Sequence, residues 1–240
     1  STVDQLWRAA DAAELARRTE VLARHLVARG VGTDTLVGVC LERSFEMVVA
    51  LMGSLRAGAA YVPIDPEYPR ERVAHMLTDS GVKIVLGQAR FAELLAGFAG
   101  DVVWLDRDWA AVEARQAASE LPRVIAAEQS AYAIYTSGST GRPKGAVNTH
   151  GAILNRLLWM QAEYRLTAAD RALQKTPFSF DVSVWEFFWP LMVGARLVLA
   201  QPGGHRDGAY LVELIRREGI TTLHFVPSML HAFLEHQGAR

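Results

Sequence analysis

Apolar runs rich in Val, Ile and Leu alternate along this chain with segments of helical periodicity. Residues 36–41 form one such run and predict a buried strand. Behind it, apolar side chains recur at helical spacing from Phe45 to Leu55. Ser44 is placed to act as the N-cap of this helix, and Gly58 stands where a helix-ending glycine belongs. Together these segments predict one strand–helix unit.

Similar units follow further along the chain. Their strand and helix ranges are 82–86 with 91–95, 102–105 with 109–112, and 223–225 with 229–234. This alternation is typical of a parallel sheet whose strands are joined by crossover helices. The sequence therefore predicts an α/β fold of repeated strand–helix units, with mainly parallel sheets and flanking helices.

Two connecting segments interrupt this pattern. Pro63, Pro66 and Pro69 predict a rigid extended connection, with Pro69 as the first residue of a helix that runs to Gly81. Residues 114–129 are rich in Ala and charge and poor in large apolar side chains, which indicates a surface connection. We therefore predict two α/β subdomain portions, residues 1–120 and 121–240.

Composition excludes several classes of protein. Half of the 240 residues are hydrophobic, and 25 basic residues balance 26 acidic ones, so the chain can form a packed core and shows no basic excess for nucleic acid. It has no apolar run long enough to span a bilayer and no leader-like start, which predicts a cytoplasmic, non-membrane protein. The single cysteine, Cys40, lies in an apolar run, is expected to be buried, and can form neither an internal disulfide nor a metal cluster.

A glycine-rich segment after the apolar run 131–135 carries the candidate chemistry. It reads Tyr135-Thr-Ser-Gly-Ser-Thr-Gly-Arg-Pro-Lys-Gly145. Glycines let backbone N–H groups approach an anion, hydroxyls donate further hydrogen bonds, and a lysine supplies a positive charge. The segment therefore predicts a phosphate-binding loop.

This loop is not a Walker A motif, which needs Gly-Lys-Ser/Thr at the start of a helix. Here Lys144 stands between Pro143 and Gly145. A solvated Ser/Gly linker is the simplest alternative, but linkers rarely lie directly after a buried strand. The sequence therefore favours phosphate binding and disfavours a P-loop kinase.

Together with two further segments, the loop resembles the adenylation domains of nonribosomal peptide synthetases. These belong to the adenylate-forming superfamily, with acyl-CoA synthetases and luciferases. The further segments are residues 55–72, which contain Tyr61-Val-Pro-Ile-Asp-Pro-Glu-Tyr-Pro69, and Phe178-Ser-Phe-Asp-Val-Ser-Val-Trp-Glu186. The resemblance implies the large N-terminal subdomain of the adenylate-forming fold.

The resemblance also implies an activity. Such domains use ATP and Mg²⁺ to convert an amino acid to an aminoacyl adenylate, then pass it to phosphopantetheine on a peptidyl carrier protein domain. The matching phosphate-binding residues are Thr136, Ser137, Gly138, Ser139, Thr140, Gly141 and Lys144. By the same resemblance, Asp181 pairs with the substrate α-ammonium and Phe180 neighbours the reacting carboxylate.

The residues that match the family's side-chain pocket are Val182, Trp185 and His224, and with Asp181 they resemble the pattern of serine-activating members. Trp185 would leave a small cavity, and His224 can both donate to and accept from a hydroxyl. L-serine is therefore the expected substrate. Simpler interpretations are an N-cap role for Asp181, ordinary core packing for Trp185, and a core strand histidine for His224.

The chain also departs from the family. The opening is shorter than usual between Trp7 and Glu14, and residue 240 precedes the family's later motifs. No catalytic residue and no metal ligand are therefore expected among these residues, and the fragment is not expected to catalyse efficiently alone.

Two alternatives to amino-acid activation remain open. One is a noncatalytic partner-binding piece, with an MbtH-like helper protein docking near Ser54 to Tyr61. The other is an acyl-CoA or aryl-acid ligase, which would lack the ammonium partner at Asp181.

Overall fold

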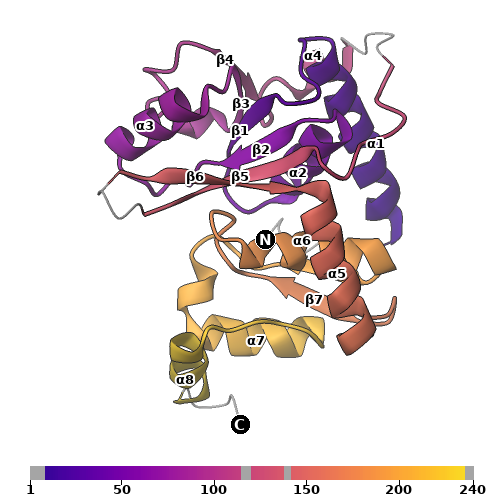
Figure 1. The fold of residues 1–240 in the computed structure, drawn as a ribbon. Coiled ribbons are helices and arrows are strands. Elements are labelled where there is room, and N and C mark those ends of the chain that lie inside the picture. The colour runs from indigo at the N-terminus through magenta and orange to yellow at the C-terminus, as the bar shows by residue number, and fades with distance from the viewer. Residues whose placement is uncertain (1–8, 115–119, 138–141, 236–240) are drawn as a thin grey trace. The chain divides into compact units, whose positions relative to one another are not determined.

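A computed structural model describes residues 9–114, 120–137 and 142–235. The described residues form two compact units that divide between Asn155 and Arg156. We call them the first and the second unit and describe each by itself. Figure 1 labels their helices and strands.

A six-stranded sheet forms the centre of the first unit, in the order β4-β3-β1-β2-β5-β6. Its strands are β1 (Leu36–Cys40), β2 (Ala60–Pro63), β3 (Ile84–Gly87), β4 (Asp101–Trp104), β5 (Ser130–Thr136) and β6 (Lys144–Thr149). Neighbouring strands are parallel except for β5 and β6, which form an antiparallel hairpin. The predicted, mainly parallel α/β architecture is confirmed.

The helices of this unit precede, connect or follow the strands of the sheet. They are α1 (Ala9–Val27), α2 (Phe45–Arg56), α3 (Arg70–Ser80), α4 (Trp109–Ala114) and a 3-10 helix (Ala89–Phe91), while α5 (His150–Tyr164) crosses the division between the units. No helix in the described part of the chain combines the length and apolar character needed to cross a membrane.

Local signals explain where two of these helices begin and end. Ser44 Oγ accepts a hydrogen bond from Met47 N at the start of α2, as a capping serine does. Helix α3 begins directly after Pro69 and ends at Gly81, whose φ of 65° is left-handed. We predicted Pro69 as the first residue of this helix. It is instead the residue directly before it.

Two segments of the first unit differ from the prediction. Residues 60–63 form strand β2 and not only an extended connection. Pro63 is the last residue of β2, so its missing donor costs little, and Ile64 N donates to Val39 O at 2.8 Å. The predicted helix at 91–95 is only the 3-10 helix Ala89–Phe91 followed by turns.

The sheet also continues past the connection at residues 114–129. Strand β5 pairs with β2 through Tyr61 and Tyr132, so segments on both sides of residue 120 share one sheet. The boundary between the two compact units thus lies between Asn155 and Arg156, downstream of the boundary predicted at residue 120.

The second unit is built on two parallel strands, β7 (Arg171–Gln174) and β8 (Arg196–Leu199). The strand predicted at residues 223–225 is wrong: these residues form no strand, and only an isolated bridge between Ala172 and Thr222 lies just before them. The helices of this unit are α6 (Val182–Val193), α7 (Gly208–Glu218), α8 (Pro227–Glu235) and a 3-10 helix (Gly204–Arg206). Its apolar core contains Leu173, Val198, Ala200, Leu211 and Leu214.

The core of the first unit makes a prediction about Cys40. Its side chain is 0% exposed, and burial raises the pKa of the thiol to about 12. Because the thiolate is the reactive form, iodoacetamide at about pH 8 should not label Cys40 in the native protein. Mass spectrometry should find labelling only after denaturant is added. Rapid native labelling would contradict this burial.

Candidate functional site

The β5–β6 hairpin places the two ends of the predicted phosphate loop side by side. Thr136, at the end of β5, is the register partner of Lys144, at the start of β6. Thr136, Ser137 and Lys144 are all exposed. The remaining loop residues of the prediction, Gly138, Ser139, Thr140 and Gly141, lie outside the described residues.

Helix α3 holds the base of this hairpin. His75 Nε2 hydrogen-bonds to Pro143 O at 3.1 Å; because a carbonyl only accepts, Nε2 carries the proton. The Tyr135 hydroxyl donates to Asp79 Oδ2 at 2.7 Å, and its ring meets His75 edge-on. Burial and the Asp79 carboxylate both raise the pKa of Tyr135, which keeps this donor protonated. The residues before and after the loop are thus anchored to one helix.

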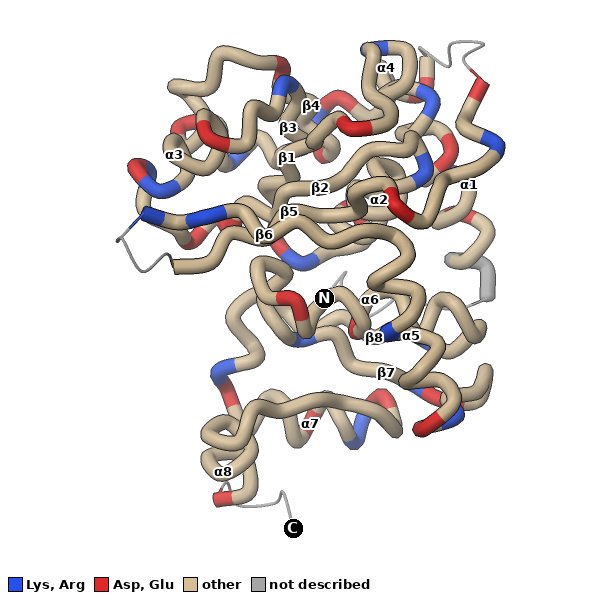
Figure 2. The backbone as a smooth tube through the Cα atoms, in the orientation of Figure 1, with Lys and Arg blue, Asp and Glu red and all other residues tan. Residues whose placement is uncertain are grey.

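Positive charge is available at the same end of the hairpin. Arg142 and Lys144 are exposed, and no ion pair joins either of them to another described residue. Figure 2 shows basic positions in blue next to the undescribed segment before β6. Exposed hydroxyls with unneutralised cations are the donor set that a polyphosphate requires.

The described residues do not form a metal cage. Among them, His, Cys, Asp and Glu side chains nowhere gather in a group of three.

In the second unit, Phe180 and Asp181 lie in the turn that leads from β7 into α6. Both are exposed, Phe180 by 58%. Asp181 occupies the N-cap position of α6, but its side chain makes no capping hydrogen bond. The interpretation of Asp181 as a helix cap is therefore not supported by a hydrogen bond, and its carboxylate is exposed to solvent.

Trp185 and His224 come together although they are far apart in sequence. Their ring centroids are 5.9 Å apart at 86°, and Trp185 also meets Trp189 edge-on at 5.9 Å. Val182, one turn before Trp185 on α6, is half-buried. Among the described residues His224 has no hydrogen-bond partner, so the interpretation as a satisfied core histidine is not supported.

The protonation of His224 follows from its surroundings. Burial lowers its pKa, and the positive charge of Lys175 lowers it further. The ring is therefore neutral near neutral pH, with one donor and one acceptor nitrogen. This is the state that can recognise a hydroxyl.

Sequence reasoning missed the residues that hold these groups in place. They are His75 and Asp79 behind the hairpin, and Lys175 and Glu186 beneath the turn before α6. Glu186 did leave a signal, since it is the one charged residue in the otherwise apolar helix Val182–Val193. The hairpin belongs to the first unit and the Asp181 group to the second, so the structure establishes each group separately.

Curated relatives match nearly the whole chain. It is 49% identical over 225 residues to tyrocidine synthase 3 of Brevibacillus parabrevis, covering 94% of this chain and 3% of the relative. It is 50% identical over 223 residues to phosphinothricin tripeptide synthetase PhsB of Streptomyces viridochromogenes, covering 92% and 19%. The chain thus spans only a small part of the length of these relatives.

Solved structures agree with the fold. The nonribosomal peptide synthetase FmoA3 bound to alpha-methyl-L-serine-AMP superposes with a TM-score of 0.83 and 35% identity, covering 92% of this chain and 24% of that one. Its AMPPNP-bound form gives a TM-score of 0.82 and 36% identity, covering 91% and 23%.

A family profile also matches the chain, over residues 3–240, and its description is AMP-binding enzyme. The matched range contains the β5–β6 hairpin and the Asp181 turn, and the relatives are peptide synthetases. The chain therefore belongs to the AMP-binding enzyme family, as part of an adenylation domain of the nonribosomal peptide synthetase type.

Proposed function

We propose that the protein carrying this chain activates an amino acid, L-serine in the first place, as aminoacyl-AMP with release of pyrophosphate. The aminoacyl group then passes to phosphopantetheine on a peptidyl carrier protein domain, and the cytoplasm, which holds ATP, is the place of action. The observation that carries the proposal is Asp181, an exposed carboxylate without a capping bond, directly before the helix that bears Trp185.

The chemistry needs positioning and charge neutralisation more than proton transfer. A carboxylate is already ionised near neutral pH, so its oxygen can form a bond to the α-phosphorus without a general base. The bond from the α-phosphorus to the bridging oxygen breaks, and pyrophosphate leaves with the electron pair. The exposed cations Arg142 and Lys144 and the hydroxyls of Thr136 and Ser137 supply positive charge and donors to the polyphosphate. Mg²⁺, when bound to the phosphates, adds further neutralisation.

The second unit would recognise the amino acid. The Asp181 carboxylate pairs with the α-ammonium, and the aromatic ring of Phe180 lies beside it in the same turn. Trp185 limits the space for the side chain, and neutral His224, at 5.9 Å from its ring, offers a donor and an acceptor to a hydroxyl. The alpha-methyl-L-serine adenylate bound to FmoA3 supports a substrate of this size and polarity.

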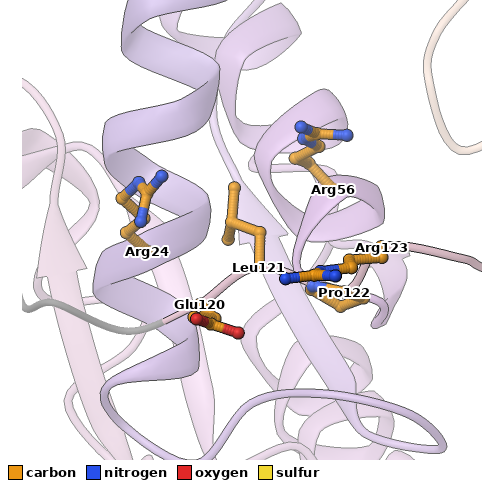
Figure 3. A pocket seen from close by; sticks show the side chains of 6 residues that line it. All are labelled: Arg24, Arg56, Glu120, Leu121, Pro122 and Arg123. Carbon is orange, nitrogen blue, oxygen red and sulfur yellow. The ribbon is translucent and has the colours of Figure 1, made fainter.

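A small helper protein of the MbtH-like type is a further proposed partner, docking near Ser54 to Tyr61. In the structure the alanines of this segment are buried, and Arg56 is exposed. Arg56 lines a cavity of about 360 Å³ together with Arg24, Glu120, Leu121, Pro122 and Arg123 (Figure 3). Because the alanines are covered, a helper at this place would contact the basic, acidic and apolar side chains around the cavity.

Loss of the carboxylate at Asp181 tests the proposal. When Asp181→Asn is made in the full-length enzyme that carries this chain, the kcat/KM for the amino acid in ATP–pyrophosphate exchange should fall at least about tenfold. A hydrogen bond to a charged group contributes roughly 1.5–3 kcal/mol, and about 1.4 kcal/mol is a factor of ten. Glu213→Gln, which removes a charge that is 74% exposed on α7, is the control and should match the wild type. If Asp181→Asn retained full activity, or if a des-amino acid replaced the substrate, an acyl or aryl ligase would be the better assignment.

Substrate choice tests the role of His224. The wild type should prefer serine over alanine in the exchange assay, because only serine offers a hydroxyl to the imidazole. His224→Leu keeps much of the volume and removes both nitrogens. It should lower kcat/KM for serine by about tenfold and leave alanine nearly unchanged. A wild type that prefers alanine would refute the serine assignment.

The anchor of the phosphate hairpin makes a separate prediction. His75→Phe keeps an aromatic ring beside Tyr135 and removes the hydrogen bond to Pro143 O. KM for ATP should rise about two- to tenfold, as expected for one hydrogen bond, while KM for the amino acid stays the same. His231→Phe, at a side chain 80% exposed on α8, is the control. Equal rises in both KM values would show general damage to the fold.

A further inference from the structure

Glu186 is a carboxylate buried in an apolar helix. Its side chain is 0% exposed, and α6 otherwise consists of apolar residues and Ser183. A buried charge without partners is costly, so its surroundings must supply hydrogen bonds. This makes its contacts worth tracing one by one.

All of its partners lie at the end of β7 and in the two residues that follow. Oε2 accepts from the backbone N–H groups of Lys175 at 3.2 Å and Thr176 at 2.9 Å, and from Gln174 Nε2 at 3.2 Å. Oε1 accepts from Thr176 Oγ at 2.7 Å. Burial raises the pKa of Glu186, and the bonds to Thr176 and the charge of Lys175 oppose that rise. Glu186 therefore ties α6 to the backbone that leaves β7.

The short segment from Thr176 to the start of α6 is held at its other end as well. Ser183 Oγ, in the first turn of α6, hydrogen-bonds to Phe180 O at 2.6 Å and to Phe178 O at 3.3 Å. Phe180 N donates to Pro177 O at 3.0 Å. The side chains of Phe180 and Asp181 are exposed, yet the backbone that carries them is fixed to α6 on both sides.

We propose that Glu186 is a positioning residue for substrate binding: its carboxylate sets the path of residues 176–181 and thereby the place of Phe180 and Asp181. This inference rests on the proposed function for its effect on the amino acid, and on the contacts alone for its effect on the backbone. Glu186 touches neither substrate nor reacting atoms and acts through Thr176.

Two substitutions of Glu186 separate the length of its side chain from its charge. Glu186→Gln keeps the reach: its oxygen can accept from the three N–H groups at Oε2, and its NH₂ can donate to Thr176 Oγ, whose hydroxyl also accepts. Glu186→Asp keeps the charge but is one methylene shorter. If Glu186 acts by its position, amino-acid binding should be retained in Glu186→Gln and lost in Glu186→Asp. If it acts by its charge, binding should be retained in Glu186→Asp and lost in Glu186→Gln.

Exchange kinetics of the two variants provide the test. In Glu186→Asp, KM for the amino acid should rise at least about tenfold, since a misplacement of about 1 Å can cost on the order of 100-fold. KM for ATP should change less than about twofold, because the β5–β6 hairpin does not depend on Glu186. In Glu186→Gln, KM for the amino acid should return to within about threefold of the wild type. Glu213→Asp and Glu213→Gln, on the exposed face of α7, are the matched controls.

A backbone readout keeps this inference separate from the proposed function. Amide hydrogen exchange at Phe180 and Ser183 should be faster in Glu186→Asp and unchanged in Glu186→Gln. The wild type could show no amino-acid-dependent ATP–pyrophosphate exchange while its amide hydrogens still behaved in this way. The proposed function would then fail, and the role of Glu186 in fixing the backbone would stand.

Three outcomes would overturn the inference. Both variants could bind the amino acid as the wild type does. The aspartate variant could have a lower KM for the amino acid than the glutamine variant. The amides of Phe180 and Ser183 could exchange their hydrogens at equal rates in both variants.

Discussion

The parallel pairing of strands is the constraint on which both units depend. A parallel strand cannot be joined to its neighbour by a tight turn, so the chain must leave each carboxyl end and return through a longer connection. In the first unit the segment after β5 begins at Ser137 and returns as the antiparallel strand β6, and in the second the segment after β7 begins at Lys175. Both candidate binding groups lie at the carboxyl end of a strand that pairs in parallel with a neighbour, β5 with β2 and β7 with β8. This is the edge at which open α/β sheets bind their ligands.

The exposed candidate groups on these segments are held by side chains of neighbouring helices. His75 and Asp79 on α3 hold the two sides of the β5–β6 hairpin, and Glu186 on α6 holds the start of the turn that carries Asp181. In each case one helix that packs on a core also bonds to the backbone next to the exposed residues. Rigid support of this kind leaves the exposed groups in place before a ligand arrives, which lowers the entropy lost on binding.

Charge is distributed in the same local way. The chain is nearly neutral overall, with 25 basic and 26 acidic residues. The exposed cations Arg142 and Lys144 lie in the first unit, and the exposed carboxylate of Asp181 lies in the second. Under the proposed function a polyphosphate and an ammonium would meet separate, complementary groups, and a balanced net charge is compatible with binding both.

The sequence by itself determined the α/β class, the strands β1, β3, β4 and β5, the caps of α2, the glycine that ends α3, and the motifs that identify the family, because these depend on local periodicity and residue type. Only the tertiary structure decided that β2 extends to Pro63, that β5 joins β2, and that Trp185 meets His224. It also revealed what Glu186 and His75 do. Such roles depend on contacts between residues that are distant in sequence or on different elements, and a single sequence without its folded backbone does not encode those distances in any local pattern.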